Sequence, residues 1–392
     1  MIHQTPVAGS YLLKWAGDLL DVTVQLPVPR PGRAAFRTNI GFASIHRKEI
    51  IALTETGTTP LARDWHDIPM QEQAPGHFTV RIPLTEVGIF SGKACFFEAN
   101  NDHPQWPAGD NLTIKVEPAF TACANTMYTA FVRQFGAARY QNPSNDQTQH
   151  HEAALDQRGY TVIPPSGTFR DLIRQLSHIQ TNLRFRIVQL LPIHPIPTTY
   201  ARMGRFGSAF AALDFLSVDP AMAEFDPYAS PLDQFRELVE AVHGHGGFLY
   251  IDLPANHTGW AATLQTHHPD WYHRQEDGKF VSPGAWGVTW ADLVELDYTD
   301  PRLCIYMAEV FLFWCRQGVN GFRCDAGYMI PAETWDYIVA RVREEYPDTV
   351  FLLEGLGGPV DVTEHLLSKT DLNWAYSELF QTENRSAMDW YL

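Results

Sequence analysis

The stretch Gly321-Phe322-Arg323-Cys324-Asp325-Ala326 decides the fold of this chain. It follows a long apolar segment and reads as a short buried strand that ends in a carboxylate. Side chains alternate between the two faces of a strand, so we expect Arg323 and Asp325 to point the same way. A guanidinium in that position keeps a carboxylate ionised and oriented, as a nucleophile at neutral pH requires. A structural Arg–Asp pair is an equally good interpretation of this stretch alone.

Two other stretches have the same form, an apolar run that ends in an acid. They are Phe248-Leu249-Tyr250-Ile251-Asp252 upstream and Phe351-Leu352-Leu353-Glu354 downstream. Strands of this kind, separated by helical segments, predict a parallel barrel whose site lies at the carboxyl ends of the strands. Asp325 and Glu354 would then face each other on neighbouring strands. Two facing carboxylates are the usual apparatus of a glycosidase.

On these residues the chain resembles the α-amylase family, glycoside hydrolase family 13. The segment from Asp252 to Asn256 and His257 is similar to the first conserved region of that family. The stretch at 321–325 is similar to the second region, and Glu354 stands where the third region has its general acid/base. Each motif alone is weak, but their order and spacing together are specific. The resemblance covers roughly residues 126–392.

The resemblance implies a (β/α)8 TIM-type barrel and retaining chemistry on α-glucans by double displacement. Asp325 attacks the anomeric carbon, while Arg323 keeps it ionised and aimed. Glu354 protonates the leaving oxygen and then deprotonates the incoming water or sugar hydroxyl. The two carboxyl groups should then lie about 5 Å apart.

The resemblance also implies a set of substrate-binding residues. Asp252 and His257 would contact the sugar or brace the floor of the cleft. Phe210 stands where the family often has a tyrosine platform for the reacting sugar, although a packed loop aromatic is an equal alternative. His194 would contact substrate or brace its loop. Asn256 has the place of a calcium-binding asparagine of some members, but accompanying acids are not evident, so the sequence favours neither calcium nor any other metal or cofactor.

The acceptor of the glycosyl group is left open by the motifs. The second region continues Ala326-Gly327-Tyr328, without the Lys-His of many α-amylases. This favours work on glycogen or maltodextrin, by a hydrolase, a debranching-type 4-α-glucanotransferase or a maltosyltransferase. A non-catalytic glucan-binding relative is the alternative from another class.

Composition excludes other classes of partner and favours the cytoplasm. The net charge of −16, without a basic run, argues against nucleic acid and against an anionic membrane surface. The five cysteines are scattered, as reduced thiols are. Lys14 directly follows Tyr11-Leu12-Leu13, so we expect no signal peptide, and nothing approaches membrane-spanning length. The oligomeric state is not predicted.

The chain of 392 residues predicts two domains, with a boundary near Glu117-Pro118-Ala119. Residues 1–118 read as an all-β, Ig-like sandwich, for which a structural cap is favoured over carbohydrate binding through exposed tryptophans. Its predicted strands are 20–26, 34–40, 49–53, 77–82, 93–98 and 112–116. Residues 119–392 form the barrel, with an insert at 258–300 after its third strand.

The barrel pattern is incomplete in this sequence. A closed barrel needs eight strands, and we identify strands at 127–132, 185–191, 246–252, 321–325, 351–354 and 373–379. The His-Asp pair of the fourth family region has no counterpart, so we expect a truncated piece of a longer enzyme that is unstable alone, with a complete but degenerate relative as the alternative. His150 and His151 are more typical of a solvated loop than of a metal site. Glu378 is more typical of the surface than of the mouth.

Overall fold

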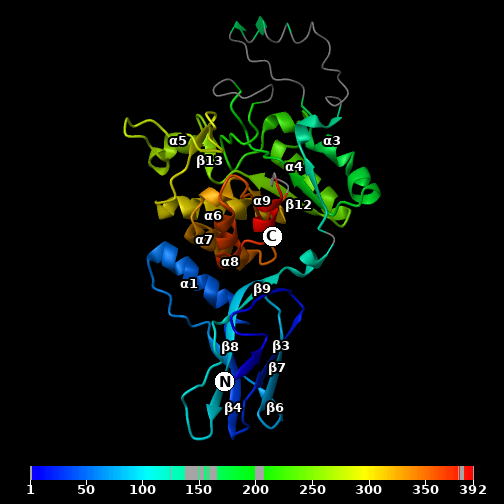
Figure 1. Cartoon of the computed structure of the whole chain (residues 1–392). Coiled ribbons are helices and arrows are strands. Elements are labelled where there is room, and N and C mark those ends of the chain that lie inside the picture. The colour runs from blue at the N-terminus through cyan, green and yellow to red at the C-terminus, as the bar shows by residue number, and fades with distance from the viewer. Residues whose placement is uncertain are drawn as a thin grey trace. The chain divides into compact units, whose positions relative to one another are not determined.

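The computed structural model describes residues 2–123, 125–136, 150, 154–155, 157–158, 166–198, 207–377, 379 and 384–391. His151 and Glu378 lie outside the described residues. The chain divides into two compact units, traced in Figure 1. The first is Met1–Ala124 with Val339–Asp348, and the second is Asn125–Ile338 with Thr349–Leu392. The domains predicted from the sequence, residues 1–118 and 119–392 with the insert at 258–300, stay a prediction.

The first unit contains two β-sheets. One has the strand order β1-β3-β7-β6 and the other β2-β9-β8-β4-β5. The strands are β1 His3–Thr5, β2 Tyr11–Trp15, β3 Leu19–Gln25, β4 Gly32–Thr38, β5 His66–Pro69, β6 Gln71–Ala74, β7 His77–Pro83, β8 Gly88–Glu98 and β9 Leu112–Glu117. Neighbouring strands are antiparallel except β2 and β9, which pair in parallel. Five of the six predicted strands are confirmed.

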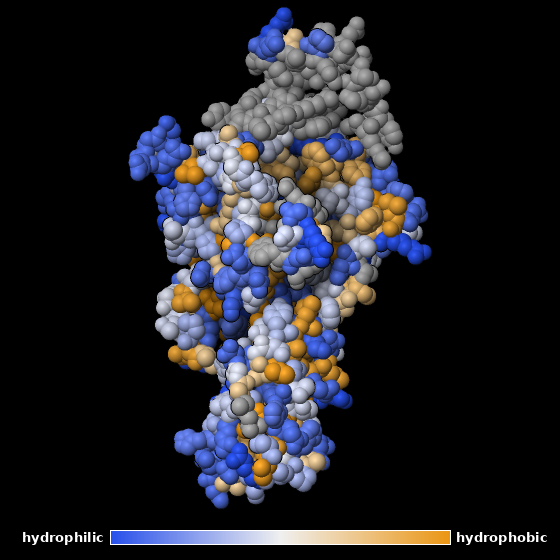
Figure 2. Space-filling model, viewed as in Figure 1, coloured by the Kyte–Doolittle hydropathy of each residue, from blue (hydrophilic) through white to orange (hydrophobic). Residues whose placement is uncertain are grey.

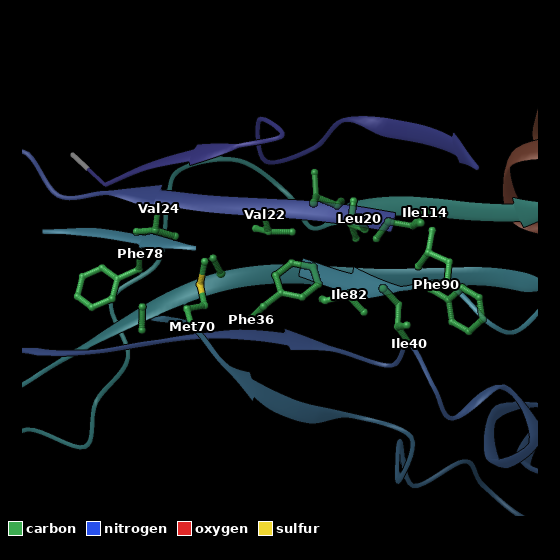
Figure 3. Close-up of a cluster of buried hydrophobic side chains, with 14 of the residues drawn as sticks. Leu20, Val22, Val24, Phe36, Ile40, Met70, Phe78, Ile82, Phe90 and Ile114 are labelled. Carbon is green, nitrogen blue, oxygen red and sulfur yellow. The ribbon is translucent and has the colours of Figure 1, made fainter. Parts of the chain in front are cut away.

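The core of the first unit is made by alternating residues of these strands. In β3, Leu20, Val22 and Val24 are buried while the residues between them are more exposed. Figure 3 shows these side chains facing Phe36 of β4 in the other sheet, and Ile82 of β7 is paired with Leu20 in the same sheet. Burial of apolar surface of this kind stabilises the unit by about 25 cal/mol per Å².

The strand predicted at residues 49–53 is wrong. This segment lies within helix α1, Ala43–Thr56. Its β-branched Ile50-Ile51 pair favours a strand, but the flanking Arg47-Lys48-Glu49 and Ala52-Leu53 favour a helix. Gly57 then ends the helix in the left-handed conformation, with φ 67°. A five-residue window was too short to show the helical context.

The second unit is organised around a six-stranded parallel sheet with strand order β10-β11-β12-β17-β18-β19. Its strands are β10 Met127–Ala130, β11 Ile187–Leu190, β12 Phe248–Leu253, β17 Gly321–Cys324, β18 Val350–Leu353 and β19 Trp374–Ala375. Each strand pairs with its neighbour in chain order. Helices occupy the connections between the strands (Figure 1). The predicted α/β fold, a partial barrel with six strands in this part of the chain, is confirmed.

The second unit contains the helical segments that the sequence predicts between its strands. Its helices are α3 Phe169–Ile173, α4 Pro231–Gly244, α5 Thr263–His267, α6 Pro301–Arg316, α8 Val360–Lys369, α9 Arg385–Tyr391 and the first part of α7 Ala332–Glu345, which from Val339 on belongs to the first unit. Capping boxes begin α3 at Thr168 and α4 at Ser230, each with an aspartate as the reciprocal partner. The ring of Phe311 on α6 lies 4.7 Å from that of Phe322 on β17. Phe322 therefore points into the helix layer, as alternation in the strand predicts.

The insert after β12 forms small elements of its own. These are β13 His257–Gly259, α5, the hairpin of β14 Gly284–Ala285 and β15 Val288–Thr289, and β16 Leu293–Glu295, which pairs with β13. Short 3-10 or π turns complete the description: η1 Ala119–Ala122, η2 Val132–Gln134, η4 Ser177–Asn182, η5 Pro220–Met222, η6 Pro269–Trp271 and η7 Gly327–Met329.

On the face seen in Figure 2, apolar residues are scattered among hydrophilic ones. Among the residues that the structure describes, no helix combines the length and the apolar character needed to cross a membrane.

Candidate active site

The central strands place the predicted acids at one end of the sheet. Asp252 on β12 is in register with Arg323 on β17. The ladder continues past the strand ends, where the Asp325 N–H donates to the Leu253 carbonyl at 3.2 Å. The Glu354 N–H donates to the Cys324 carbonyl at 3.0 Å. Backbone pairing therefore brings Asp252, Asp325 and Glu354 to adjacent positions from three neighbouring strands.

One guanidinium connects two of these carboxylates. Nη1 of Arg323 donates to both oxygens of Asp252, at 3.0 and 2.9 Å, and also to Oδ1 of Asp325. The side chain of Asp252 is only 1% exposed, whereas those of Arg323 and Asp325 are each 14% exposed. Asp252 therefore holds the guanidinium from below, and Asp325 presents its carboxylate at the accessible end of the pair.

Glu354 is held differently, by backbone amides. Its Oε2 accepts from the N–H of Ala326 and its Oε1 from the N–H of Leu356, both at 2.9 Å. Ala326 has a left-handed φ of 47°, which is costly for a residue with a Cβ. This conformation aims the amide that follows Asp325 at the carboxylate of Glu354. The two acids are thus linked through one strained residue.

Burial raises the pKa of two of these acids above the value of the same group in water. Burial raises the pKa of Glu354, and the charge of Arg323 only partly opposes this shift. Burial also raises the pKa of Asp252, against the opposing effect of Arg323. A carboxyl group with a raised pKa retains its proton at a higher pH, as a general acid must.

His257 lies beside the accessible carboxylate. Its Nε2 is 3.7 Å from Oδ2 of Asp325, and its ring centroid is 6.4 Å from that of Trp290. The histidine is 1% exposed, and burial lowers its pKa despite the neighbouring negative charge. A neutral imidazole at this place can hydrogen-bond a sugar hydroxyl without competing with Arg323 for Asp325.

Two aromatic rings flank Arg323. Its Cζ lies 5.7 Å from the ring centroid of Phe210 and 5.9 Å from that of Tyr376. Phe210 is therefore brought to the site, and its contact with a sugar stays a prediction. Tyr376 was not identified from the sequence. It directly follows the short strand β19, so an aromatic residue at the end of the predicted sixth strand is the one signal that could have pointed to it.

His194 lies apart from this group. It has no exposed surface, and its ring packs edge-on against Phe215 and Trp314, with centroids 5.9 and 5.6 Å away. Its Nδ1 is 3.3 Å from the carbonyl oxygen of Ser217. Burial lowers the pKa of His194 to about 4. The structure thus favours the loop-bracing alternative over contact with substrate.

Asn256 also faces protein. It is 2% exposed, and its side-chain amide lies 3.2 Å from the sulfur of Met329. In the described part of the chain, no three His, Cys, Asp or Glu side chains are grouped so that they could hold a metal ion. Through this contact, Asn256 connects the loop between β12 and β13 to the segment that follows β17.

Comparison with known proteins gives a consistent set of relatives. No family model matches the chain. An α-1,4-glucan:maltose-1-phosphate maltosyltransferase from Myxococcus xanthus is 33% identical over 202 residues, which cover 49% of this chain and 30% of the relative. The enzyme of that name from Burkholderia pseudomallei is 31% identical over 237 residues, which cover 58% of this chain and 20% of the relative.

Among solved structures, an α-amylase from Lactobacillus plantarum is similar with a TM-score of 0.49 and 26% identity, over 66% of this chain and 51% of that one. These relatives agree with the resemblance to the α-amylase family. The resemblance first drawn from the conserved regions is thereby confirmed. The chain matches no more than about a third of the length of the curated relatives quoted above.

Proposed function

We propose that this chain carries the nucleophile and the acid/base of a retaining enzyme that acts on α-glucans by double displacement. The supporting observation is the pair of unlike carboxylates at neighbouring strand ends. Asp325 lies beside a guanidinium, and Glu354 is buried and accepts hydrogen bonds from two backbone amides. The raised pKa of Glu354 suits the acid of the mechanism, and the position of Asp325 beside Arg323 suits the nucleophile.

In the first step, Asp325 attacks the anomeric carbon while Glu354 gives its proton to the leaving oxygen. In the second, Glu354 takes a proton from the incoming hydroxyl, whose oxygen displaces Asp325 from the anomeric carbon. Asp252 orients Arg323 from beneath, and His257 and Phe210 contact the sugar bound at Asp325. We expect the two carboxyl groups to be about 5 Å apart, since no water stands between nucleophile and sugar.

Transfer of a maltosyl group is the form of this chemistry that the relatives favour, because both relatives quoted above are maltosyltransferases. The debranching-type glucanotransferase, simple hydrolysis and a role in glycogen metabolism stay alternatives within the proposal. A cytoplasmic location is also part of it, supported by the scattered positions of the five cysteines in the sequence.

The test is mass spectrometry of the intact protein after incubation with an α-glucosyl or α-maltosyl fluoride. We expect a sugar adduct on the peptide that contains Asp325, and none in Asp325→Ala. Asp270→Ala, which removes an exposed acid of the insert, is the matched control and keeps the adduct. A folded protein that binds maltodextrin but forms no adduct would establish the non-catalytic alternative.

A donor panel then separates the forms of the reaction. Maltose 1-phosphate with a glucan acceptor gives free phosphate and a longer glucan only in a maltosyltransferase. Maltodextrin alone gives reducing sugar in a hydrolase, and redistributed chain lengths in a glucanotransferase.

A further inference from the structure

The β14–β15 hairpin of the insert has an unfavourable residue at its turn. Gly284 pairs with Thr289 and Ala285 with Val288, so the turn consists of Trp286 and Gly287 alone. Both have positive φ, 52° and 75°. This is the turn for which Asn-Gly is the preferred sequence, and a large side chain in its first position is strained.

Packing does not explain the tryptophan. Trp286 is 68% exposed and its neighbour Val288 is 60% exposed. A strained backbone that holds a large apolar ring in water lowers stability in two ways at once. Such a combination at the rim of a site indicates a ligand that covers the ring.

The base of the hairpin is fixed to the acid/base side of the site. A methyl group placed on Gly357, three residues after Glu354, would lie 2.9 Å from Cβ of Ala285. The same methyl group would lie 1.9 Å from the hydroxyl oxygen of Tyr328. The hairpin, the Tyr328 ring and the loop that follows Glu354 are therefore in close contact. Gly357 is needed for that approach.

The other end of the hairpin leads into the site as well. The N–H of Trp290 donates to the carbonyl of Pro283 at 2.8 Å and closes the hairpin. The Trp290 ring then lies edge-on to His257, the neighbour of Asp325. Trp286 is thus held on a short arm whose two ends meet residues beside Glu354 and Asp325.

We propose that Trp286 is the aromatic platform on which a sugar ring of the acceptor glucan stacks. The inference rests on the proposed function, because Glu354 protonates the leaving oxygen and so marks the side on which leaving and incoming sugars lie. In the transfer step, the acceptor hydroxyl oxygen bonds to the anomeric carbon as the bond to Asp325 breaks. The hydroxyl proton passes to Glu354, and Asp325 leaves as a carboxylate. A stacked acceptor favours this step over attack by water.

The decisive variant is Trp286→Asn, because Asn-Gly suits this turn better than Trp-Gly. We expect an equal or higher melting temperature together with an acceptor KM about tenfold higher, the size of one lost stacking contact. Consumption of glucosyl fluoride without acceptor should be unchanged. Trp286→Phe should restore most of the acceptor affinity. Trp106→Ala, which removes a 39%-exposed tryptophan of the first unit, is the matched control and should change neither quantity.

Equilibrium binding of maltoheptaose to the same variants, followed by tryptophan fluorescence, requires no turnover. A protein without an Asp325 adduct would refute the proposed function, yet a loss of binding in Trp286→Asn alone would still support the platform. Unchanged acceptor KM and unchanged binding in Trp286→Asn would overturn it. A lower melting temperature in that variant would show instead that the indole stabilises the fold.

Discussion

Asp325 and Glu354 are the same functional group in two different settings. Asp325 follows β17 and accepts a hydrogen bond from the guanidinium of Arg323. Glu354 follows the next strand, β18, and accepts hydrogen bonds from the backbone amides of Ala326 and Leu356. Burial raises the pKa of Glu354 and so favours its protonated form, although its two amide donors and the charge of Arg323 oppose the shift. The difference divides the chemistry into a nucleophile and an acid.

The largest effect should follow from removing the nucleophile. Asp325→Asn leaves the shape of the site intact but cannot form the ester to the sugar. We expect kcat to fall by more than about 10⁴-fold with every donor, glucosyl fluoride included. Steady-state kinetics with a glucan and with the fluoride measure this. An equal loss of kcat with both donors supports Asp325 as the nucleophile. Retained turnover of the fluoride would mean that another residue is the nucleophile.

The second effect should depend on the leaving group. Glu354→Gln cannot donate a proton, so turnover of a glucan should fall by about 10²–10⁴-fold. Fluoride needs little protonation, so formation of the Asp325 adduct from glucosyl fluoride should be nearly as fast as in the parent. Rapid-quench measurement of adduct formation provides the readout. Loss of adduct formation with the fluoride would mean that Glu354 is not the acid.

The third effect is a loss of stability, and it tests whether the positive charge of Arg323 stabilises the fold. Arg323→Met leaves Asp252 buried without its cation, at a cost of about 3–5 kcal/mol in the free energy of unfolding at neutral pH. Because burial already raises the pKa of Asp252, the variant should bind a proton there more readily than the unfolded chain. The difference in the free energy of unfolding between Arg323→Met and the parent should therefore become smaller as the pH falls.

Denaturant unfolding of Arg323→Met at several pH values measures this change. The double variant Arg323→Met with Asp252→Asn is the control, and it should recover part of the lost stability, since no buried charge remains. A deficit that does not vary with pH would show that packing of the arginine side chain, and not its charge, is what matters.

The smallest effect is a shift in a pH profile. Because burial raises the pKa of Glu354, the neutral acid persists above the pH at which a glutamate in water ionises. Activity on a glucan should fall as the pH rises through that raised value. Arg323 lowers the pKa of Glu354, so the residual activity of Arg323→Met should extend to higher pH. Profiles of kcat/KM against pH test this. If the fall in activity at high pH is still present in Glu354→Gln, it arises from the ionisation of another group.

The sequence predicted the strands of the site well because each one is short, apolar and ends in a polar residue. Residues 321–325 showed the strand, the direction of Arg323 and the exposed end at Asp325. The segment 49–53 failed for the opposite reason, since its helix α1 is defined by flanking residues and by Gly57. Strand patterns are local, whereas a helix needs a window of several turns.

Contacts between distant residues could not be predicted in the same way. Nothing in the sequence around Tyr376 places its ring near Arg323, because that proximity depends on the order of β17, β18 and β19 in the sheet. His194 has the composition of a site residue, but the packing of Phe215 and Trp314 buries it completely.

The sequence by itself determined which acids this protein has available and the order in which parallel strands present them. The tertiary structure alone decided how those acids differ. The left-handed Ala326 turns a backbone amide toward Glu354, and one nitrogen of Arg323 is shared by Asp252 and Asp325. The physical reason is that the pKa and direction of a carboxylate depend on burial and on donors from other strands, which only the folded chain brings together.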